Sequence, residues 1–225
     1  MSLNQKLKGL NHIYRLYDDF MGGQNIVCKK YCAKCCTPDV TMTTLEGYLI
    51  ADYMILNAQA DLFENIKAKL SQTRFRPKIT TNRLADLCMK GGGPPEEEKI
   101  HSDNSCPVLK DDLCPIYEVR PFGCRCFISE MDCNQTGYAK VDPFIITVNT
   151  VCLQVIEHID ATGFSGNFAD VLLLMSEKKN RVRYKRNAFK YLNGDFVSNR
   201  PIEVLMVPPE HRNKIKPILN ALLAI

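Results

Sequence analysis

Apolar residues recur at three- and four-residue steps along several stretches of the chain, which is the spacing of amphipathic helices. The first stretch covers residues 3–20, and a glycine pair that can end the helix follows it. Ahead of the second stretch, Thr43 and Glu46 have the spacing of a capping box and predict a helix start. Further along, Asp142 and Pro143 suit the N-cap and the first position of a long helix. The chain is therefore predicted to be mainly helical.

Weaker signals complete this prediction. Further helices are predicted over residues 60–70, 82–90, 143–162, 168–178 and 210–223. Residues 91–105 form a loop by composition, because glycine and proline open the segment. Residues 202–207 could form a short strand, but β-α-β alternation is absent from the pattern. We expect a single, mainly α domain over residues 1–225, with residues 142–225 as its C-terminal helical part.

The chain holds 11 cysteines, and most of them fall in two short windows. Residues 28–36 read C-K-K-Y-C-A-K-C-C, and residues 106–127 carry four more cysteines. The N-terminus lacks the apolar core of a signal peptide, so we expect a cytoplasmic protein whose thiols stay reduced. In that compartment clustered cysteines indicate metal binding before disulfides, and an odd total suits complete pairing badly.

Charge and hydropathy narrow the choice of partners. The formal net charge of +4 is mild, so a nucleic-acid partner is not expected. The longest clean apolar run, residues 171–175, is too short to span a bilayer, so no membrane association is expected. Residues 178–190 hold seven Lys and Arg, which we interpret as a solvated helix face. A redox partner or another protein partner is compatible with all of these features.

The cysteines of both windows are candidate ligands for a soft metal, because thiolates select zinc, copper(I) or iron–sulfur clusters over hard cations. The candidates are Cys28, Cys32, Cys35, Cys36, Cys106, Cys114, Cys124 and Cys126. If the first window is helical, Cys28, Cys32 and Cys35 share one face. Adjacent side chains diverge, so the Cys35–Cys36 pair indicates a polynuclear cluster, two neighbouring centres, or one ligand beside one packed thiol. Both windows are expected in loops or short turns between helices, so the metal site would join two distant segments.

The three remaining cysteines are interpreted differently. Cys88 and Cys152 each lie on an apolar predicted helix, and we interpret both as buried and inert. The sequence does not decide between ligation and packing for Cys133. Among the four histidines, His101 lies close to Cys106 and is the one considered as a ligand, although a solvated loop histidine fits as well.

The order of these residues is similar to that of a known family. The pattern C-x-x-x-C-x-x-C-C followed by C-P-x-L, C-x-I-Y-E-x-R-P and C-R-x-F resembles the CxxCxxCC (YkgJ-type) family of zinc- or iron-chelating domains, over residues 28–127. The resemblance implies a small, mainly helical metal-binding core. The matching positions are Cys32, Cys35, Cys36, Cys106, Cys114, Tyr117, Arg120, Pro121, Cys124 and Arg125. The chain departs from the family in the longer spacing from Cys28 to Cys32 and in the additional Cys126.

Three residues near the second window are candidate supports for the bound group. Four thiolates on Zn²⁺ or on a [4Fe–4S]²⁺ core leave a charge of −2, which is costly to bury without donors. Arg120 and Arg125 bracket Cys124 and could donate N–H groups to sulfur. Tyr117 could pack beside them. Cys-Pro occurs twice, as after a ligand in bacterial ferredoxins, and C-x-x-C occurs once, so an iron–sulfur cluster of the [4Fe–4S] type is favoured over zinc.

These residues predict a cysteine-ligated metal-binding protein that acts as a redox or metal-binding module. Two alternatives stay open: a structural zinc-binding domain, and an enzyme that uses an open position of the metal on an unknown substrate. The residues do not decide whether the protein is an enzyme.

Overall fold

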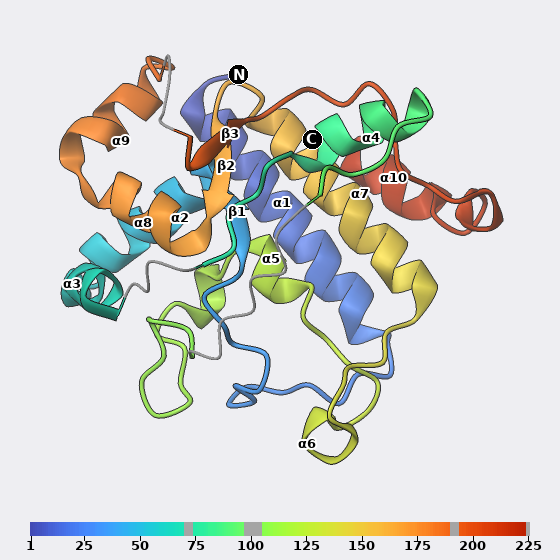
Figure 1. The fold of residues 1–225 in the computed structure, drawn as a ribbon, viewed down its shortest axis with the longest axis horizontal. Helices are drawn as coiled ribbons and strands as arrows, with labels where there is room; N and C mark the ends of the chain where they lie inside the picture. Colours follow the sequence, from blue (N-terminus) through green and yellow to red (C-terminus); the bar gives the residue numbers. More distant parts are fainter. Residues whose placement is uncertain (70–73, 97–104, 190–193, 224–225) are drawn as a thin grey trace.

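The computed structural model describes residues 1–69, 74–96, 105–189 and 194–223. Helices dominate these residues (Figure 1). The longer helices are α1 (Leu3–Gly22), α2 (Thr44–Leu56), α3 (Asp61–Lys69), α4 (Thr81–Met89), α7 (Pro143–Ile159), α8 (Phe168–Ser176), α9 (Lys178–Lys185) and α10 (Lys216–Leu222). Single turns form η1 (Tyr117–Val119), α5 (Phe122–Arg125), α6 (Cys133–Thr136) and η2 (Pro209–His211). The expected mainly α architecture is therefore present, with a small sheet added to it.

Helix α1 lies at the centre of the molecule, with α7 alongside it (Figure 1). Its buried face carries Leu10, Ile13, Tyr14 and Tyr17, which follow each other at the three- and four-residue steps of an amphipathic helix. Ser2 caps the helix through a complete capping box with Gln5. The capping box that the sequence predicted, Thr43 with Glu46, is also complete and begins α2.

A three-stranded antiparallel sheet packs beside α2 and α8. It consists of β1 (Thr41–Thr43), β2 (Phe164–Asn167) and β3 (Phe196–Ser198), in that spatial order. In the register, Met42 lies opposite Gly166. β1 leads straight out of the first cysteine window and into α2, so the sheet fixes one end of that window.

The buried carboxylate of Asp160 connects α1, α2 and α9 to the end of α7. Asp160, at the end of α7, accepts hydrogen bonds from Thr44 Oγ1 (2.7 Å) and from the Tyr184 hydroxyl (2.6 Å). Lys6 Nζ of α1 lies 3.2 Å from Asp160 Oδ1, and both side chains are buried. Because a buried charge must be compensated, this network specifies how α1, α2, α7 and α9 assemble.

The structure corrects three predicted elements. Residues 202–207 form no strand, because the Gln154 side chain of α7 binds Val204 O and Met206 N and takes the place of a neighbouring strand. The predicted helix 168–178 stops at Ser176, and the extended backbone of Glu177 separates α8 from α9. At the C-terminus, the predicted helix 210–223 is divided into η2 and the short α10.

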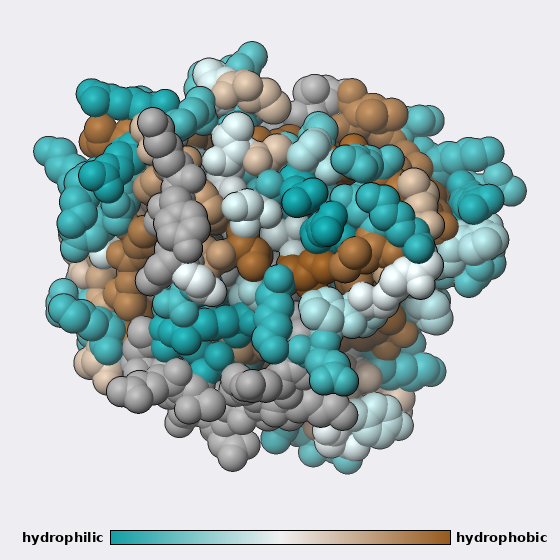
Figure 2. Space-filling model, turned by 45° about the horizontal axis from the view of Figure 1, so that its top comes forward, coloured by the Kyte–Doolittle hydropathy of each residue, from teal (hydrophilic) through white to brown (hydrophobic). Residues whose placement is uncertain are grey.

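Three loops meet at one end of the molecule, below α1 and α5 in Figure 1. They comprise residues 24–40, 105–116 and 127–142, and we call this region the loop end. The remaining elements, built around α1, α2, α7, α8 and the sheet, are the helical scaffold. In the face turned forward in Figure 2, hydrophobic surface shows only as interrupted patches among hydrophilic side chains. Within the part of the chain that the structure describes, no helix is both long and apolar enough to cross a membrane.

Candidate metal centre

The first cysteine window is an irregular loop held by short backbone turns. Cys32 N–H donates to Lys29 O (3.1 Å), and Cys36 N–H donates to Ala33 O (3.0 Å). Within the first of these turns Tyr31 has a φ of 78°, a left-handed conformation that residues other than glycine seldom adopt. The window is therefore not helical, and its cysteines are not arranged along one helix face.

The second window presents two of its cysteines through two similar turns. Leu109 N–H donates to Cys106 O, and Tyr117 N–H donates to Cys114 O, both at 3.1 Å. In each case proline follows the cysteine, at the position of a β-turn for which its fixed φ is suited. The repeated Cys-Pro pair thus has a local structural role, which is to fix the turn that carries each thiol.

Cys124 is presented by α5, and the scaffold holds α5 in place. The buried Glu46 carboxylate of α2 accepts a 2.7 Å hydrogen bond from Phe122 N–H at the start of this turn. At Gly123 a Cβ atom would lie 2.9 Å from Thr41 O, so a larger residue would push α5 away from β1. The absence of a side chain at Gly123 therefore allows Cys124 to lie close to the end of the first window.

The two windows meet, although some seventy residues separate them in the sequence. Cys106 N–H donates a 2.8 Å hydrogen bond to Cys36 O. A cavity of about 490 Å³ opens between the windows, and thiols from both of them line it. The cysteines on its wall are Cys28, Cys32, Cys35, Cys36, Cys106, Cys114 and Cys124. The structure thus brings seven of the eight candidate ligands together.

Burial raises the pKa of the three thiols of the second window that line the cavity. It raises the pKa of Cys106 to about 11, and it also raises the pKa of Cys114. For Cys124 burial raises the pKa well above its ordinary value, and the neighbouring Cys106 and Cys114 add to the effect. A metal would bind here by displacing these protons, which couples binding to pH.

The adjacent cysteines of the first window behave as a pair. The Cys35 thiol hydrogen-bonds to the Cys36 sulfur, and this bond is the main reason that the pKa of Cys36 is lowered and that of Cys35 raised. Cys36 also lies near Cys106, Cys114 and Cys124, whose charges oppose its ionisation. Cys36 therefore belongs with the inner thiols, while Cys35 is exposed at the rim.

Arg120 lies against the cavity as the sequence predicted. Its guanidinium carbon is 3.8 Å from the centre of the Tyr117 ring, and its Nη1 donates to Tyr117 O (3.0 Å). The positive charge of Arg120 lowers the pKa of Cys114 against the larger effect of burial. Both Arg120 and Tyr117 line the cavity, so they can support thiolates there.

Arg125 is buried and makes several contacts that the sequence did not predict. Its Nη1 is 2.9 Å from both carboxylate oxygens of Asp18, and its Nη2 donates to Glu118 O (2.8 Å). Nε donates to Arg120 O (3.3 Å), and the guanidinium lies over the Tyr14 ring. Through these oxygen acceptors Arg125 joins α5 to α1. Arg125 also lines the cavity, and its donation to sulfur stays a prediction.

Cys126 is the one of the eight candidate ligands that does not line the cavity. It packs against the hydrophobic core. Burial raises its pKa well above the ordinary value, and the nearby Cys152 adds to this. The reason is the helical turn of α5, in which residues two apart point in different directions. Cys124 and Cys126 therefore cannot both face the cavity.

Cys133 is a candidate that the sequence did not resolve. The 127–142 loop approaches the first window, where Val27 N–H donates to Ser129 O (3.0 Å) and the Cys28 thiol lies 4.0 Å from the same oxygen. Cys133 is near enough to Cys28 to raise its pKa, after burial and two other cysteines. Cys133 comes near Cys28 because the 127–142 loop folds back to the first window. The spacing of the cysteines along the sequence does not indicate this proximity.

The remaining cysteine predictions have mixed outcomes. Cys152 is 1% exposed on α7, so it is a packed core thiol as expected. Cys88 is exposed, which contradicts the prediction, because α4 turns Asn82, Ala85 and Asp86 inward and leaves Cys88 outside. His101 lies outside the described residues. All 11 cysteines are free of disulfide bonds.

The donor set of the cavity suits a soft metal. Seven thiols around one cavity match the sulfur ligands of zinc and of iron–sulfur clusters. The described residues contain no group of three or more Cys, His, Asp or Glu side chains already drawn together as metal ligands. The donor chemistry therefore fits such a group, while the coordination sphere itself is not preformed, and the ligand assignments remain predictions.

Comparison with known proteins agrees with the chemistry of the cavity. Residues 27–152 match the model of the CxxCxxCC family, described as a "putative zinc- or iron-chelating domain". The matched region includes both windows and extends past residue 127 to cover Cys133 and Cys152. Neither the curated proteins nor the solved structures include a match to the chain. Because the model spans more than half of the 225 residues, the chain belongs to the CxxCxxCC family of zinc- or iron-chelating domains.

Proposed function

We propose that this chain binds an iron–sulfur cluster of the [4Fe–4S] type through thiolates of both windows and acts as a redox or metal-binding module. The observation that supports this best is the cavity of about 490 Å³ that seven thiols line. Four thiolates hold one cubane cluster, so the wall offers more sulfur ligands than the cluster requires. When bound, such a cluster supplies one-electron transfer.

The size and composition of the cavity favour a cluster over a single ion. A structural zinc site closes four sulfurs around one ion at about 2.3 Å and leaves little free space. Here seven thiols lie on the wall of a larger, open cavity, and Cys35 and Cys36 offer adjacent sulfurs that a single ion would not take together. A multi-atom cluster would use both features.

The surrounding residues would meet the charge of the bound group. A cysteine-ligated [4Fe–4S]²⁺ core carries a charge of −2, and Arg120 with its stacked Tyr117 lies at the cavity wall. Lys30 Nζ lies 5.7 Å from the centre of the same Tyr117 ring. These cations would lower the cost of holding a dianionic centre at a partly buried site.

The proposal also implies a reducing compartment such as the cytoplasm. The vicinal thiols of exposed Cys35 and half-buried Cys36 would oxidise readily in a secretory environment. In a reducing environment they remain available as ligands.

Anaerobic purification followed by iron, zinc and acid-labile sulfide analysis tests the proposal. We expect a brown protein that holds iron and sulfide in similar amounts and bleaches on exposure to air, because sulfur-to-iron charge transfer absorbs in the visible. Colourless protein with stoichiometric zinc, unchanged after reconstitution with iron and sulfide, would overturn it.

That second result would favour a structural zinc module. The partly buried thiols Cys36, Cys106, Cys114 and Cys124 are mutually close, and four thiolates suffice for a closed tetrahedral site. These four thiols would have to move closer together to hold a single ion, and metal analysis distinguishes the two alternatives.

A further inference from the structure

Exposed apolar side chains surround the mouth of the cysteine cavity. Tyr31 is 65% exposed, Leu113 is 42% exposed and Phe127 is 47% exposed, and all three line the cavity. They come from the three different loops of the loop end, so the fold gathers them at one place. Surfaces that expose several large apolar residues beside a functional site commonly bind another molecule.

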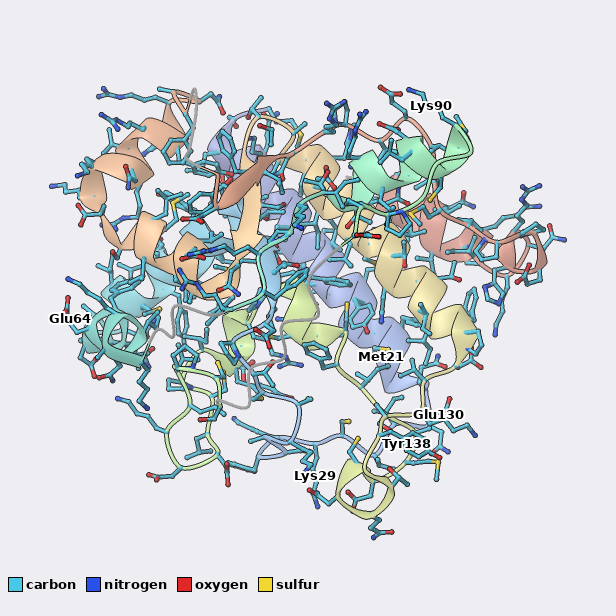
Figure 3. The ribbon with its side chains drawn as sticks, viewed as in Figure 1. Met21, Lys29, Glu64, Lys90, Glu130 and Tyr138 are labelled. Atoms are coloured by element: carbon cyan, nitrogen blue, oxygen red, sulfur yellow. The ribbon has the colours of Figure 1, made fainter. Side chains whose placement is uncertain are left out.

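The same surface is basic on one side. Lys29, Lys30 and Lys34 lie inside the first window, which contains no acidic residue. All three side chains are exposed, and no ion pair to any of them is found among the described residues. Figure 3 shows Lys29 at the loop end, at the same end of the molecule as Tyr138. An acidic patch on a partner would therefore meet uncompensated positive charge here.

We propose that the cavity mouth, defined by Lys29, Lys30, Tyr31, Lys34, Leu113 and Phe127, is the docking surface for a small acidic electron-carrier protein of the ferredoxin class. The lysines would attract the carrier and set its orientation, and the apolar residues would supply the central contact. A carrier docked there lies directly over the thiols of both windows. The choice of partner rests on the proposed redox function, whereas the docking surface itself does not.

The pattern of charge favours a protein over a lipid bilayer. Asp111 and Asp112 are exposed beside Leu113, and Asp132 is exposed beside Met131. A uniformly anionic membrane surface would repel these carboxylates while it attracted the lysines. A folded partner can present acidic groups to the lysines and basic groups to the aspartates.

The test measures binding of the metal-loaded protein, as purified, to the acidic ferredoxins of the same organism by isothermal titration calorimetry at low and high salt. We expect binding that weakens as salt rises. Lys29→Glu/Lys30→Glu should weaken it at least ~10-fold at low salt, because rim charges govern steering and orientation. Tyr31→Ser/Phe127→Ser should weaken it at both salt concentrations, because this pair contributes apolar contact.

Lys178→Glu/Lys185→Glu on the exposed basic face of α9 is the matched control, since it makes the same change of charge away from the cavity. This control should bind as the parent does. Equal weakening by both charge variants, no binding to any ferredoxin, or binding only to anionic vesicles or single-stranded RNA would overturn the proposal. Retained metal content and circular dichroism show that each variant is folded.

The two proposals fail separately. If metal analysis finds zinc and the purified protein still binds the carrier through the lysines, the redox function fails and the docking surface stands. If the protein contains an iron–sulfur cluster but the lysine variant binds as well as the parent, the docking proposal fails alone.

Discussion

The helical scaffold and the loop end are stabilised in different ways. In the scaffold, α1, α2, α7 and α8 share a continuous core, and its buried charges have partners, as Lys6 has in Asp160. At the loop end the backbone is irregular, the thiols are only partly buried, and few hydrogen bonds cross between the loops. The scaffold can therefore fold by burial alone, whereas the loop end needs a further source of order.

This contrast explains why the cysteines gather where regular structure is absent. A metal supplies its own directional bonds, so the chain that carries its ligands needs no ladder of backbone hydrogen bonds. The scaffold fixes one part of each window: β1 follows the first window, and Glu46 holds α5 in the second window. The predictions below separate these two sources of stability.

The largest expected effect comes from removing an inner ligand. Replacing Cys106 or Cys114 by Ser should abolish stoichiometric metal binding, because a hydroxyl is a poor ligand for soft metals. The stabilisation by metal should be lost with it, which is about 4 kcal/mol for a ligand present at ~1,000 times its Kd. Metal analysis and thermal unfolding, with and without a chelator, measure both quantities.

Exposed Cys88 provides the control for these variants. Cys88→Ser should keep its metal and unfold like the parent. If Cys106→Ser destabilises the chelator-treated protein as much as the loaded protein, then packing rather than ligation explains the effect.

The second effect concerns the junction between the two regions. Glu46 accepts hydrogen bonds from Thr43 N, the Tyr14 hydroxyl and Phe122 N, at 2.8, 3.0 and 2.7 Å. Glu46→Ala would leave these buried donors unpaired and should cost about 3–4 kcal/mol in the free energy of unfolding. Urea unfolding of the metal-free protein measures this cost.

Glu64→Ala makes the same substitution in the first turn of α3, where the side chain is exposed. Its cost should be no more than about 0.5 kcal/mol, because it removes only a favourable interaction with the helix dipole. Similar costs for the two variants would mean that Glu46 does not hold the loop end to the scaffold.

The third effect is a dependence on pH in the metal-free protein. Burial raises the pKa of Cys106 from its ordinary value of 9.0 to about 11. Between these values an unfolded chain has released the thiol proton and the folded chain retains it, so stability falls as pH rises through this window. Below pH 9 the contribution is fully present.

Denaturant midpoints measured across this range should decline less steeply in Cys106→Ala than in the parent. The same slope in both proteins would show that other groups, such as the buried tyrosines, cause the decline.

Much of the scaffold could be predicted because its signals are local. The Thr43–Glu46 capping box and the periodic apolar face of α1 each specify a helix from neighbouring residues. The break at Glu177 and the lack of a strand at residues 202–207 could not be predicted, because tertiary contacts decide both. The sequence therefore predicts the helices better than their ends and their partners.

The same distinction applies to the candidate site. The clustered cysteines indicated a metal site shared by two distant windows, and the fold brings the thiols of both windows to one cavity. The partner of Arg125 is Asp18 on α1, more than one hundred residues earlier, and no local pattern identifies it. The direction of Cys126 depends on the single helical turn of α5. Such directions follow from tertiary structure and not from residue type.

The smallest expected effect tests the direction of Cys126. Cys126 packs against the core beside Cys152, whereas Cys124 lines the cavity only two residues earlier. Cys126→Ser should therefore retain the full metal content and cost about 1 kcal/mol, because it introduces a hydroxyl into a largely apolar site. Cys124→Ser, the same change on the same turn, should lose the metal. If Cys126→Ser also loses the metal while its metal-free form remains stable, then Cys126 is a ligand, and α5 must rearrange when metal binds.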